Sequence, residues 1–397
     1  MKKIASTLLV AGTLASTALM ADGAITAVKV NTNLDKVSYN SGVWKDAKFS
    51  SVTLYPQTTI KFNDKKANEK NAEPKAITAE IAAVYNGQRI AFMIKWPDGT
   101  KNVQYAGRTD SYADGFAVQF ASNYSNPKEL PYIGMGSEGR QVVIHLQKET
   151  VKIYEPNGNG DVWHQVNPNQ THLFGKDLAA FNKEVASIGN GDYERSYVGE
   201  GFRSMTEIKD GSNNSYSRIG YTGNGWSGTL SRDMKDAYVD LHADAIPVAF
   251  AIWDGENMGR NGLKYLTGWT SVELKKGSEL TKALSGVVGG DIEAGKQAVA
   301  ENCASCHQIT PADAPSLMGP SLTNIGGYAS ADYIRESMMK PSAVVVPGYN
   351  RNAHSAYAWY NLEDGKRVST MPDFSWLEAA QMDNIVAYLK TLKAEVK

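Results

Sequence analysis

The sequence lacks an excess of charge of either sign, and beyond its first residues it lacks long hydrophobic runs. The formal net charge is −1, and the Lys and Arg residues are scattered rather than gathered into a stripe. A basic stripe is the usual footprint of nucleic-acid binding, so nucleic acid is not an expected partner. No later segment is apolar over the roughly 20 residues that a membrane span requires. We therefore expect no transmembrane segment in the mature chain.

The N-terminal residues have the layout of an export signal. The stretch MKKIASTLLVAGTLASTALMADG begins with two lysines, continues through a short apolar run and ends in small residues near Ala21. This order is typical of a cleaved secretory signal. Glycine, serine and threonine interrupt the run, which favours cleavage near Ala21 over retention as a membrane anchor. The sequence thus predicts a signal peptide over residues 1–21 and a periplasmic protein.

Cysteine is scarce, and both cysteines stand together. Cys303 and Cys306 lie in ENCASCHQ, directly before His307, and are the only two cysteines among 397 residues. An exported C-x-x-C pair can form a small disulfide or a redox dithiol, but the adjacent histidine completes the C-x-x-C-H site of a c-type haem. Covalent haem needs two thioether links and a proximal imidazole. We predict one covalent haem c on Cys303 and Cys306, with His307 bound to its iron. No cysteine remains for a zinc or iron–sulfur site.

Length and patterning predict two domains of different class. Hydrophobic residues make up 42% and charged residues 21% of the chain, which describes a globular protein too long for one ordinary core. From about Asn31 to Leu274 short alternating segments such as RIAFMIKW, GFAVQF, RQVVIHLQ, VKIYE, IPVAFAIWDG and GWTSVELKK are separated by Gly- and Asn-rich turns. Two of these segments end alike, in KWPDG and IWDG. The fold class is therefore multidomain: an all-β antiparallel sandwich over 22–283, then a small all-α domain over 284–397.

The helical part resembles the class I cytochromes c. It presents a helix leading into the C-x-x-C-H motif, a Gly319–Pro320 pair, Met371 in STMPDF, and an amphipathic last helix. The resemblance implies His307 as the proximal iron ligand and Met371 as the distal one. Met318, Met338, Met339 and His354 are its rivals; Met371 is favoured because it precedes Pro372 in a loop just before the last helix. Two filled axial positions leave no open iron site, so such a haem transfers electrons.

The β domain taken by itself does not disclose a function, because a sandwich can bind carbohydrate, a protein or a cofactor. Four segments nevertheless resemble the haem b-binding γ subunits of periplasmic molybdoenzymes of the dimethyl sulfoxide reductase family, which include ethylbenzene dehydrogenase. These segments are IAFMIKWPDGT, YADGFAVQF with PYIGMGSEGRQVVIHL, DVWHQVNP, and VAFAIWDGENMGRNGLKYLTGWTSVEL. The resemblance implies one non-covalent haem b, with its iron bound by Met135 and Lys264.

Lysine ligation makes a chemical demand that the structure can test. An ammonium cannot bind iron, so the pKa of Lys264 must fall from its usual value near ~10.4 through burial and the iron's charge. Without the resemblance, Lys264 would be read as a surface lysine and Met135 as core filling. His145 and His164 are nearby alternatives to Lys264, which would give a methionine–histidine haem.

The leading hypothesis is a dihaem electron-transfer protein that is not itself a catalyst. Its expected partners are the catalytic and iron–sulfur subunits of a molybdoenzyme, and a soluble or membrane cytochrome. A second hypothesis makes the β domain a ligand- or protein-binding module beside a single haem c. A third leaves one haem five-coordinate and assigns turnover of peroxide or nitrogen oxides.

Overall fold

The computed structural model describes residues 24–60, 63–103, 112–122, 124, 126–149, 193–209, 211–212, 214–285, 288–351, 353 and 356–397. Several features expected from the sequence lie outside the described residues: the signal peptide, the strand VKIYE, the DVWHQVNP segment with His164, and His354. Among the described residues, no helix combines the length and the apolarity needed to cross a membrane.

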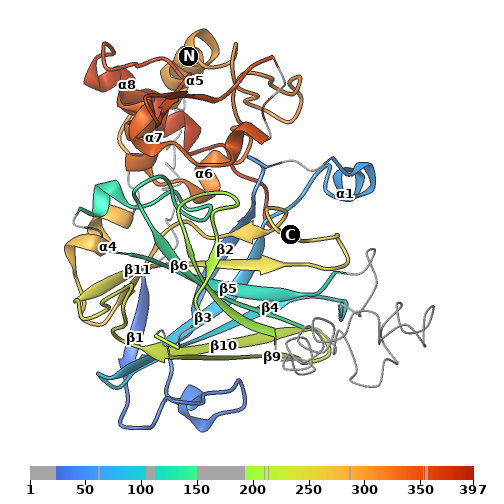
Figure 1. Cartoon of the computed structure of the whole chain (residues 1–397), viewed down its shortest axis with the longest axis vertical. Coiled ribbons are helices and arrows are strands. Elements are labelled where there is room, and N and C mark those ends of the chain that lie inside the picture. Colours follow the sequence, from blue (N-terminus) through green and yellow to red (C-terminus); the bar gives the residue numbers. More distant parts are fainter. Residues whose placement is uncertain are drawn as a thin grey trace, which may run out of the picture.

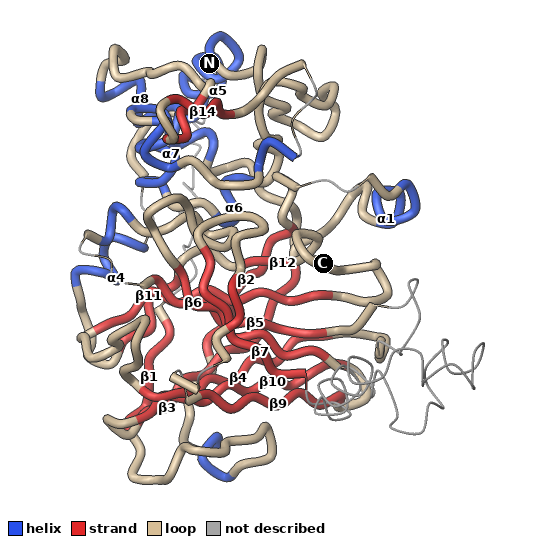
Figure 2. The backbone as a smooth tube through the Cα atoms, viewed as in Figure 1, coloured by secondary structure: helices blue, strands red, loops and turns tan. Residues whose placement is uncertain are grey.

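The N-terminal domain is a β-sandwich whose strands form one continuous sheet, thirteen strands among the described residues. They are β1 (Ile25–Lys29), β2 (Ser50–Pro56), β3 (Ile77–Tyr85), β4 (Arg89–Pro97), β5 (Gly115–Ala121), β6 (Val142–Lys148), β7 (Tyr193–Gly199), β8 (Thr206–Glu207), β9 (Ser215–Tyr221), β10 (Gly225–Asp233), β11 (Ala245–Trp253), β12 (Tyr265–Leu266) and β13 (Thr270–Glu273). The strand order is β8-β7-β6-β5-β11-β12-β2-β3-β4-β10-β9, with β1 joined to β13 and β3. Figure 2 shows these strands gathered in the lower part of the molecule. The predicted all-β class is confirmed, although β1 pairs parallel with both of its neighbours.

The sheet folds over so that β4 faces β5 and β11. The Phe92 ring lies 5.8 Å from that of Phe120 and 6.0 Å from that of Phe250, in edge-to-face contacts across the two layers. The alternation predicted in RIAFMIKW is confirmed, since its Ile and aromatic side chains all enter this inner core. The inner core thus follows directly from the period-2 pattern of the strands.

Strands β5, β6 and β11 are buried on both faces. Phe116, Val118 and Phe120 of β5 point into the sandwich, whereas Ala117 and Ala121 belong to a second apolar cluster on the outer face. That second cluster also contains the core of the C-terminal domain. The outer face of these strands is therefore an interior surface, covered by loops and by the neighbouring domain.

The C-terminal domain is helical, as predicted. Its helices are α5 (Ile292–Asn302), α6 (Ile325–Tyr328), α7 (Ala331–Met339) and α8 (Ala379–Leu389), and it has 3₁₀ turns at Pro341–Val344 and Tyr349–Arg351. The described part of the β domain also contains short helices, α1 (Lys65–Lys70) and α4 (Glu279–Leu284), and 3₁₀ turns at Gly42–Lys45 and Pro127–Glu129. Asp291 caps α5 by accepting from the backbone N–H groups of Glu293 and Ala294. A Cβ at Gly295 would lie 1.9 Å from the carbonyl oxygen of Asn384, so glycine is what lets α5 cross α8 so closely.

A hairpin in this domain was not predicted. Strands β14 (Tyr360–Glu363) and β15 (Lys366–Ser369) pair antiparallel ahead of Met371. Asp364 and Gly365 both have positive φ, 48° and 77°, as a tight two-residue hairpin turn requires. The Asp-Gly pair is a recognisable hairpin signal, but the helical pattern around it dominates the sequence.

The two domains are packed against each other, as Figure 1 shows, with the helical domain above the sandwich. Arg140 donates two hydrogen bonds to Glu336 of α7, at 2.7 and 2.6 Å. The Asn324 side chain donates to the Pro56 carbonyl oxygen at 2.6 Å, and the end of the chain pairs with Ala76 through Val396. These contacts, with the shared apolar cluster, set the position of one domain against the other.

Candidate haem sites

The C-x-x-C-H segment forms a tight turn directly after α5. The backbone N–H groups of Cys306 and His307 both donate to the Cys303 carbonyl oxygen, at 3.0 and 2.9 Å. Cys303 is the C-cap residue of α5, so the two cysteines and His307 lie close together in the turn that ends this helix. All three side chains line one cavity of about 530 Å³.

His307 is held by one ring nitrogen, leaving the other for a metal. Its Nδ1 lies 2.8 Å from the Pro320 carbonyl oxygen, so Nδ1–H donates and Nε2 keeps its lone pair. Burial lowers the pKa of His307, which favours the neutral form that a metal ligand requires. A Cβ at Gly319 would come within 2.6 Å of the imidazole, which explains the glycine of the Gly–Pro pair.

Three of the four candidate methionines line the same cavity: Met318, Met338 and Met371. Met339, 39% exposed, is not among its lining residues. Met318 is 46% exposed, and Met338 is packed in the core on α7. Met371 lies in a loop that is tied to α7 by the N–H of Phe374, which donates to the Met338 carbonyl oxygen at 2.9 Å. The lining leaves three thioethers available, and Met371 stays the predicted distal ligand because of its loop position ahead of α8.

A second cavity, of about 260 Å³, lies on the outer face of β5, β6 and β11. Alanines 117, 249 and 251 line it, and their small side chains leave space above the sheet. Met135 and Lys264, far apart in the sequence, both line this cavity. The structure therefore brings together the two residues that the resemblance paired.

Lys264 is buried, 6% exposed, and directly precedes β12. Its carbonyl oxygen accepts from Gln57 N–H at 2.9 Å, while its Nζ lies 5.4 Å from the centre of the Trp253 ring. Within the described part of the chain, its amine has no hydrogen bond or ion pair. Burial, and then the charge of Lys148, lower the pKa of Lys264 to about 8. The burial part of the chemical demand on Lys264 is met, and the positive charge of a bound iron would lower its pKa further.

Met135 occupies an unusual backbone position. Its φ is +81°, in a turn closed by Met135 N–H donating to the Ile133 carbonyl at 3.0 Å and by Gly136 N–H donating to the Tyr132 carbonyl at 2.8 Å. Non-glycine residues with positive φ are uncommon and concentrate at functional sites. The turn holds the buried Met135 side chain at the wall of the cavity.

The donor set fits a haem b whose iron takes a thioether and an amine. The cavity also contains two cationic side chains that the sequence reading missed, Lys148 and Arg203, which could pair with haem carboxylates. Lys148 was detectable in principle, because it follows Ile144 and Leu146 at period 2 on the cavity face of β6. Burial lowers its pKa to about 8 as well.

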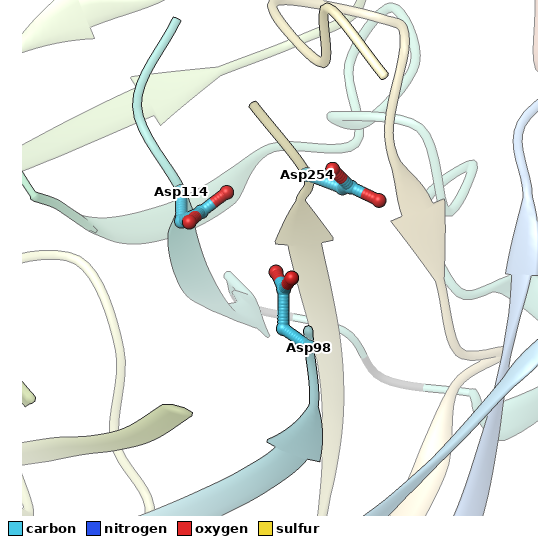
Figure 3. Close-up of side chains that lie close together, drawn as sticks. All are labelled: Asp98, Asp114 and Asp254. Atoms are coloured by element: carbon cyan, nitrogen blue, oxygen red, sulfur yellow. The ribbon is translucent and has the colours of Figure 1, made fainter. Parts of the chain in front are cut away.

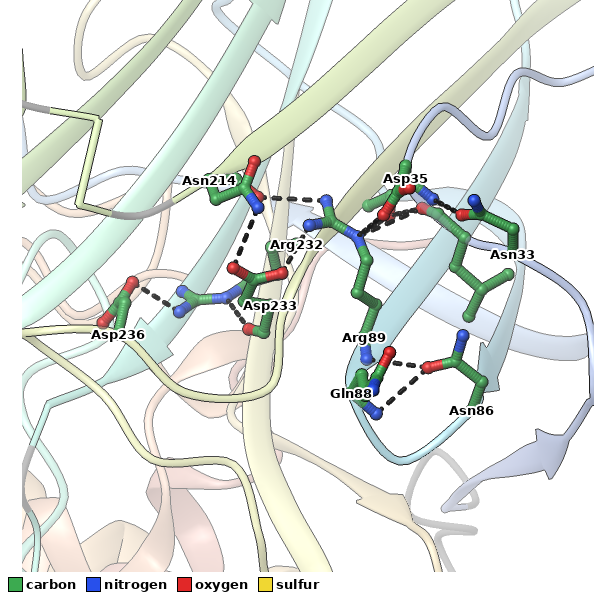
Figure 4. Close-up of polar contacts among 11 residues, drawn as sticks. Asn33, Asp35, Asn86, Gln88, Arg89, Asn214, Arg232, Asp233 and Asp236 are labelled. Carbon is green, nitrogen blue, oxygen red and sulfur yellow. Dashed lines mark hydrogen bonds and ion pairs between the residues drawn. The ribbon is translucent and has the colours of Figure 1, made fainter.

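His145 lies on the other face of β6, inside the sandwich, and does not line the second cavity. Its Nδ1 is 2.8 Å from Ser196 Oγ, and its Nε2 is 3.1 Å from the guanidinium of Arg232. Arg232 is fully buried and also pairs with Asp236 at 2.5 Å (Figure 4). Burial and the Arg232 charge lower the pKa of His145 well below its usual value. His145 therefore serves as a neutral acceptor for a buried arginine.

Three carboxylates converge at one end of the sandwich: Asp98, Asp114 and Asp254, with oxygens within 4.8 Å of one another (Figure 3). Asp98 and Asp254 are the aspartates of the two similar segments KWPDG and IWDG. Asp114 accepts from the N–H groups of Gly255 and Asn102, each at 2.7 Å, and from Trp226 Nε1 at 3.1 Å. It is a hydrogen-bonded junction between strand ends, and burial raises its pKa to about 7.

Comparisons with known proteins give a match for each of the two domains. The family described as ethylbenzene dehydrogenase matches residues 41–265, and the cytochrome c family matches residues 292–393. The chlorate reductase subunit gamma of Ideonella dechloratans is 26% identical over 237 residues, which cover 59% of this chain and 77% of that protein.

Solved structures give only remote similarity. A family 9 carbohydrate-binding module of Caldicellulosiruptor kristjanssonii, in complex with cellotriose, aligns at 6% identity with a TM-score of 0.31, covering 64% of this chain and 95% of the module. The same module with glucose aligns at 8% identity with a TM-score of 0.30, covering 64% and 97%. Such TM-scores carry no argument about this chain.

Proposed function

Because this chain belongs to the ethylbenzene dehydrogenase family, of the γ-subunit type, and continues into a cytochrome c domain, we propose that it is a periplasmic dihaem electron-transfer protein. In this proposal haem c is linked to Cys303 and Cys306, and haem b occupies the cavity of Met135 and Lys264. The signal peptide over 1–21 exports the chain, and residues 22–283 and 284–397 are its two haem domains.

The convergence of Met135 and Lys264 carries the proposal. A soft thioether and a buried amine with lowered pKa line one cavity, although they come from different loops of the sandwich. Among the described residues the Lys264 amine has no hydrogen-bonding partner, and neither the packing of the core nor the solubility of the domain requires such a lysine there. A haem b supplies a Lewis-acidic iron for both groups.

At the predicted haem c site, the chain's own residues favour electron transfer rather than catalysis. The Pro320 carbonyl oxygen orients the His307 imidazole, and the Met371 loop is anchored on α7. His307 and Met371 would together hold the haem c iron, and the haem would supply one-electron transfer at a potential that a methionine raises relative to a second imidazole.

The description of the relative supports the proposed partners. That protein is described as the subunit gamma of a chlorate reductase, a name that implies further subunits. We infer that this chain relays electrons between the iron–sulfur and catalytic subunits of a molybdoenzyme and a soluble or membrane cytochrome.

Haem type and stoichiometry test the proposal. Mature protein from a strain that loads haem b is extracted with acidified organic solvent, and pyridine haemochrome spectra are taken of the extract and the residue. One extractable haem b and one covalent haem c per chain are expected. Covalent haem alone, at full occupancy, would refute the dihaem relay and make the sandwich a binding module.

A further inference from the structure

The loop between β5 and β6 separates the two cavities. Tyr132 lines the cavity of Cys303 and His307, whereas the next residue, Ile133, lines the cavity of Met135 and Lys264. Among the described residues of the sandwich outside this loop, Thr59 alone lines the first cavity. Adjacent residues of one short loop of the β domain thus line the two different cavities.

Tyr132 is held firmly at its place. It is 2% exposed, its hydroxyl lies 3.2 Å from Thr59 Oγ1, and its ring centre is 5.2 Å from that of Tyr333 and 5.7 Å from that of Tyr349. Tyr333 and Tyr349 belong to the helical domain. The ring therefore forms a fixed part of the boundary between the domains.

The rest of the loop is pinned to the sheet. Gln119 Nε2 donates to the Ile133 carbonyl oxygen at 2.9 Å, and Trp269 Nε1 donates to the Pro131 carbonyl oxygen at 2.8 Å. On the helical side, the Glu138 N–H donates to the Val345 carbonyl oxygen at 3.0 Å. Anchored at both ends, the loop keeps the two cavities in one relative position.

A short connected path leads from the Met135 side chain to the Tyr132 ring. It runs through the hydrogen bond from Met135 N–H to the Ile133 carbonyl, 3.0 Å, and then along two residues of backbone. We propose that the loop Leu130–Gly136 is the bridge for electron transfer between the two haems, with Tyr132 as its contact to the haem c side. The bridge passes one electron, so that one iron is oxidised by one unit and the other reduced, and Tyr132 itself keeps its electrons and proton. This inference rests on the proposed function.

The test measures the rate of electron transfer within the full-length dihaem protein. A laser-excited ruthenium complex injects one electron into haem c, and the absorbance of both haems is followed. Tyr132→Leu should lower the interhaem rate by about tenfold or more, with both haems present and both reduction potentials unchanged. Tyr132→Phe, which keeps the ring, should restore a rate close to that of the wild type.

Trp376→Leu is the matched control, because Trp376 is an aromatic residue of the helical domain that is 67% exposed and is not among the described residues that line either cavity. It should leave the interhaem rate unchanged. If Tyr132→Leu keeps both haems and transfers electrons as fast as the wild type, or if Trp376→Leu slows transfer equally, the inference is wrong while the dihaem function stands. A wild-type protein without haem b overturns the proposed function instead, and the spectra reveal this before any rate is measured.

Discussion

The pKa of Lys264 is lowered mainly by burial of its amine. The amine is enclosed beside Trp253, and the second lysine of the cavity, Lys148, lowers its pKa further. An isolated buried ammonium is costly, so the neutral amine is the better occupant of such a site. Burial therefore makes Lys264, a residue type usually found at the surface, a candidate iron ligand.

Lys264→Ala should abolish haem b binding or shift its absorption spectrum, because one axial ligand is lost. Optical spectra of the reduced and oxidised protein, with haem b content per chain, provide the measurement. Lys148→Ala is the matched control, from the same cavity, and should retain the axial ligation. The reverse result, with haem b lost only in Lys148→Ala, would transfer the ligand role to Lys148.

Met371 can be separated from its rivals by the same reasoning. Met371→Ala should leave the haem c iron five-coordinate, lower its reduction potential and create peroxidase activity, because an open axial position admits peroxide. Met318→Ala should leave the potential near that of the wild type, since Met318 is 46% exposed. Unchanged spectra in Met371→Ala would exclude it as the distal ligand.

At the scale of elements, the ends of several strands meet at Asp114. This carboxylate precedes β5 and accepts from the loop after β11 and from Trp226 of β10. Its hydrogen bonds thus connect the ends of β5, β10 and β11, which hydrophobic alternation alone would not hold together. Its pKa is raised to about 7, chiefly by burial, and also by the nearby Asp98 and Asp254.

This shift gives the β domain a characteristic pH dependence. Between pH ~4 and ~7 the unfolded chain releases the Asp114 proton while the folded protein retains it, so stability falls as the pH rises. The loss is on the order of 4 kcal/mol at most, since one pKa unit corresponds to about 1.36 kcal/mol. Urea unfolding of wild type and Asp114→Asn across this range should show a flatter profile in the variant. Parallel profiles would contradict a raised pKa.

At the scale of the whole molecule, the domains share a core and an ion pair. Arg140 and Glu336 have side chains only 19% and 16% exposed and form a two-pronged pair across the boundary. Interfaces between domains of one chain usually permit motion unless they are extensive and apolar. Here the apolar cluster crosses the boundary, which favours a fixed distance between the two sites.

Glu336→Gln should weaken domain docking by about 1–3 kcal/mol, because it leaves Arg140 half-buried with weaker acceptors. Hydrogen exchange of α7 and of the loop after β5 should rise together, with both haem contents unchanged. Glu279→Gln removes an exposed pair with Lys282 and is the control, expected to change stability by under about 0.5 kcal/mol. If hydrogen exchange of α7 is no faster in Glu336→Gln than in Glu279→Gln, the apolar cluster alone holds the two domains together.

Much of the fold was predictable from the sequence, and the reason is local. The strands around RIAFMIKW, GFAVQF and IPVAFAIWDG alternate at period 2, and α5, α7 and α8 carry helical spacing. The β14–β15 hairpin escaped prediction because four-residue strands have too few positions to outweigh the helical context. The His145 alternative could not be judged either, since facing into the sandwich depends on the register of β6 with its neighbours.

What the sequence by itself determined is the C-x-x-C-H motif and with it the predicted haem c attachment, because the motif lies within five consecutive residues and needs no long-range contact. Only the tertiary structure decided that Met135 and Lys264 share a cavity, that His145 faces away from it and serves Arg232, and that Tyr132 stands between the two sites. Each of these depends on strand register, loop anchoring and burial, which bring together residues that are distant along the chain. Local patterns predict elements, whereas the packing of those elements decides which side chains meet.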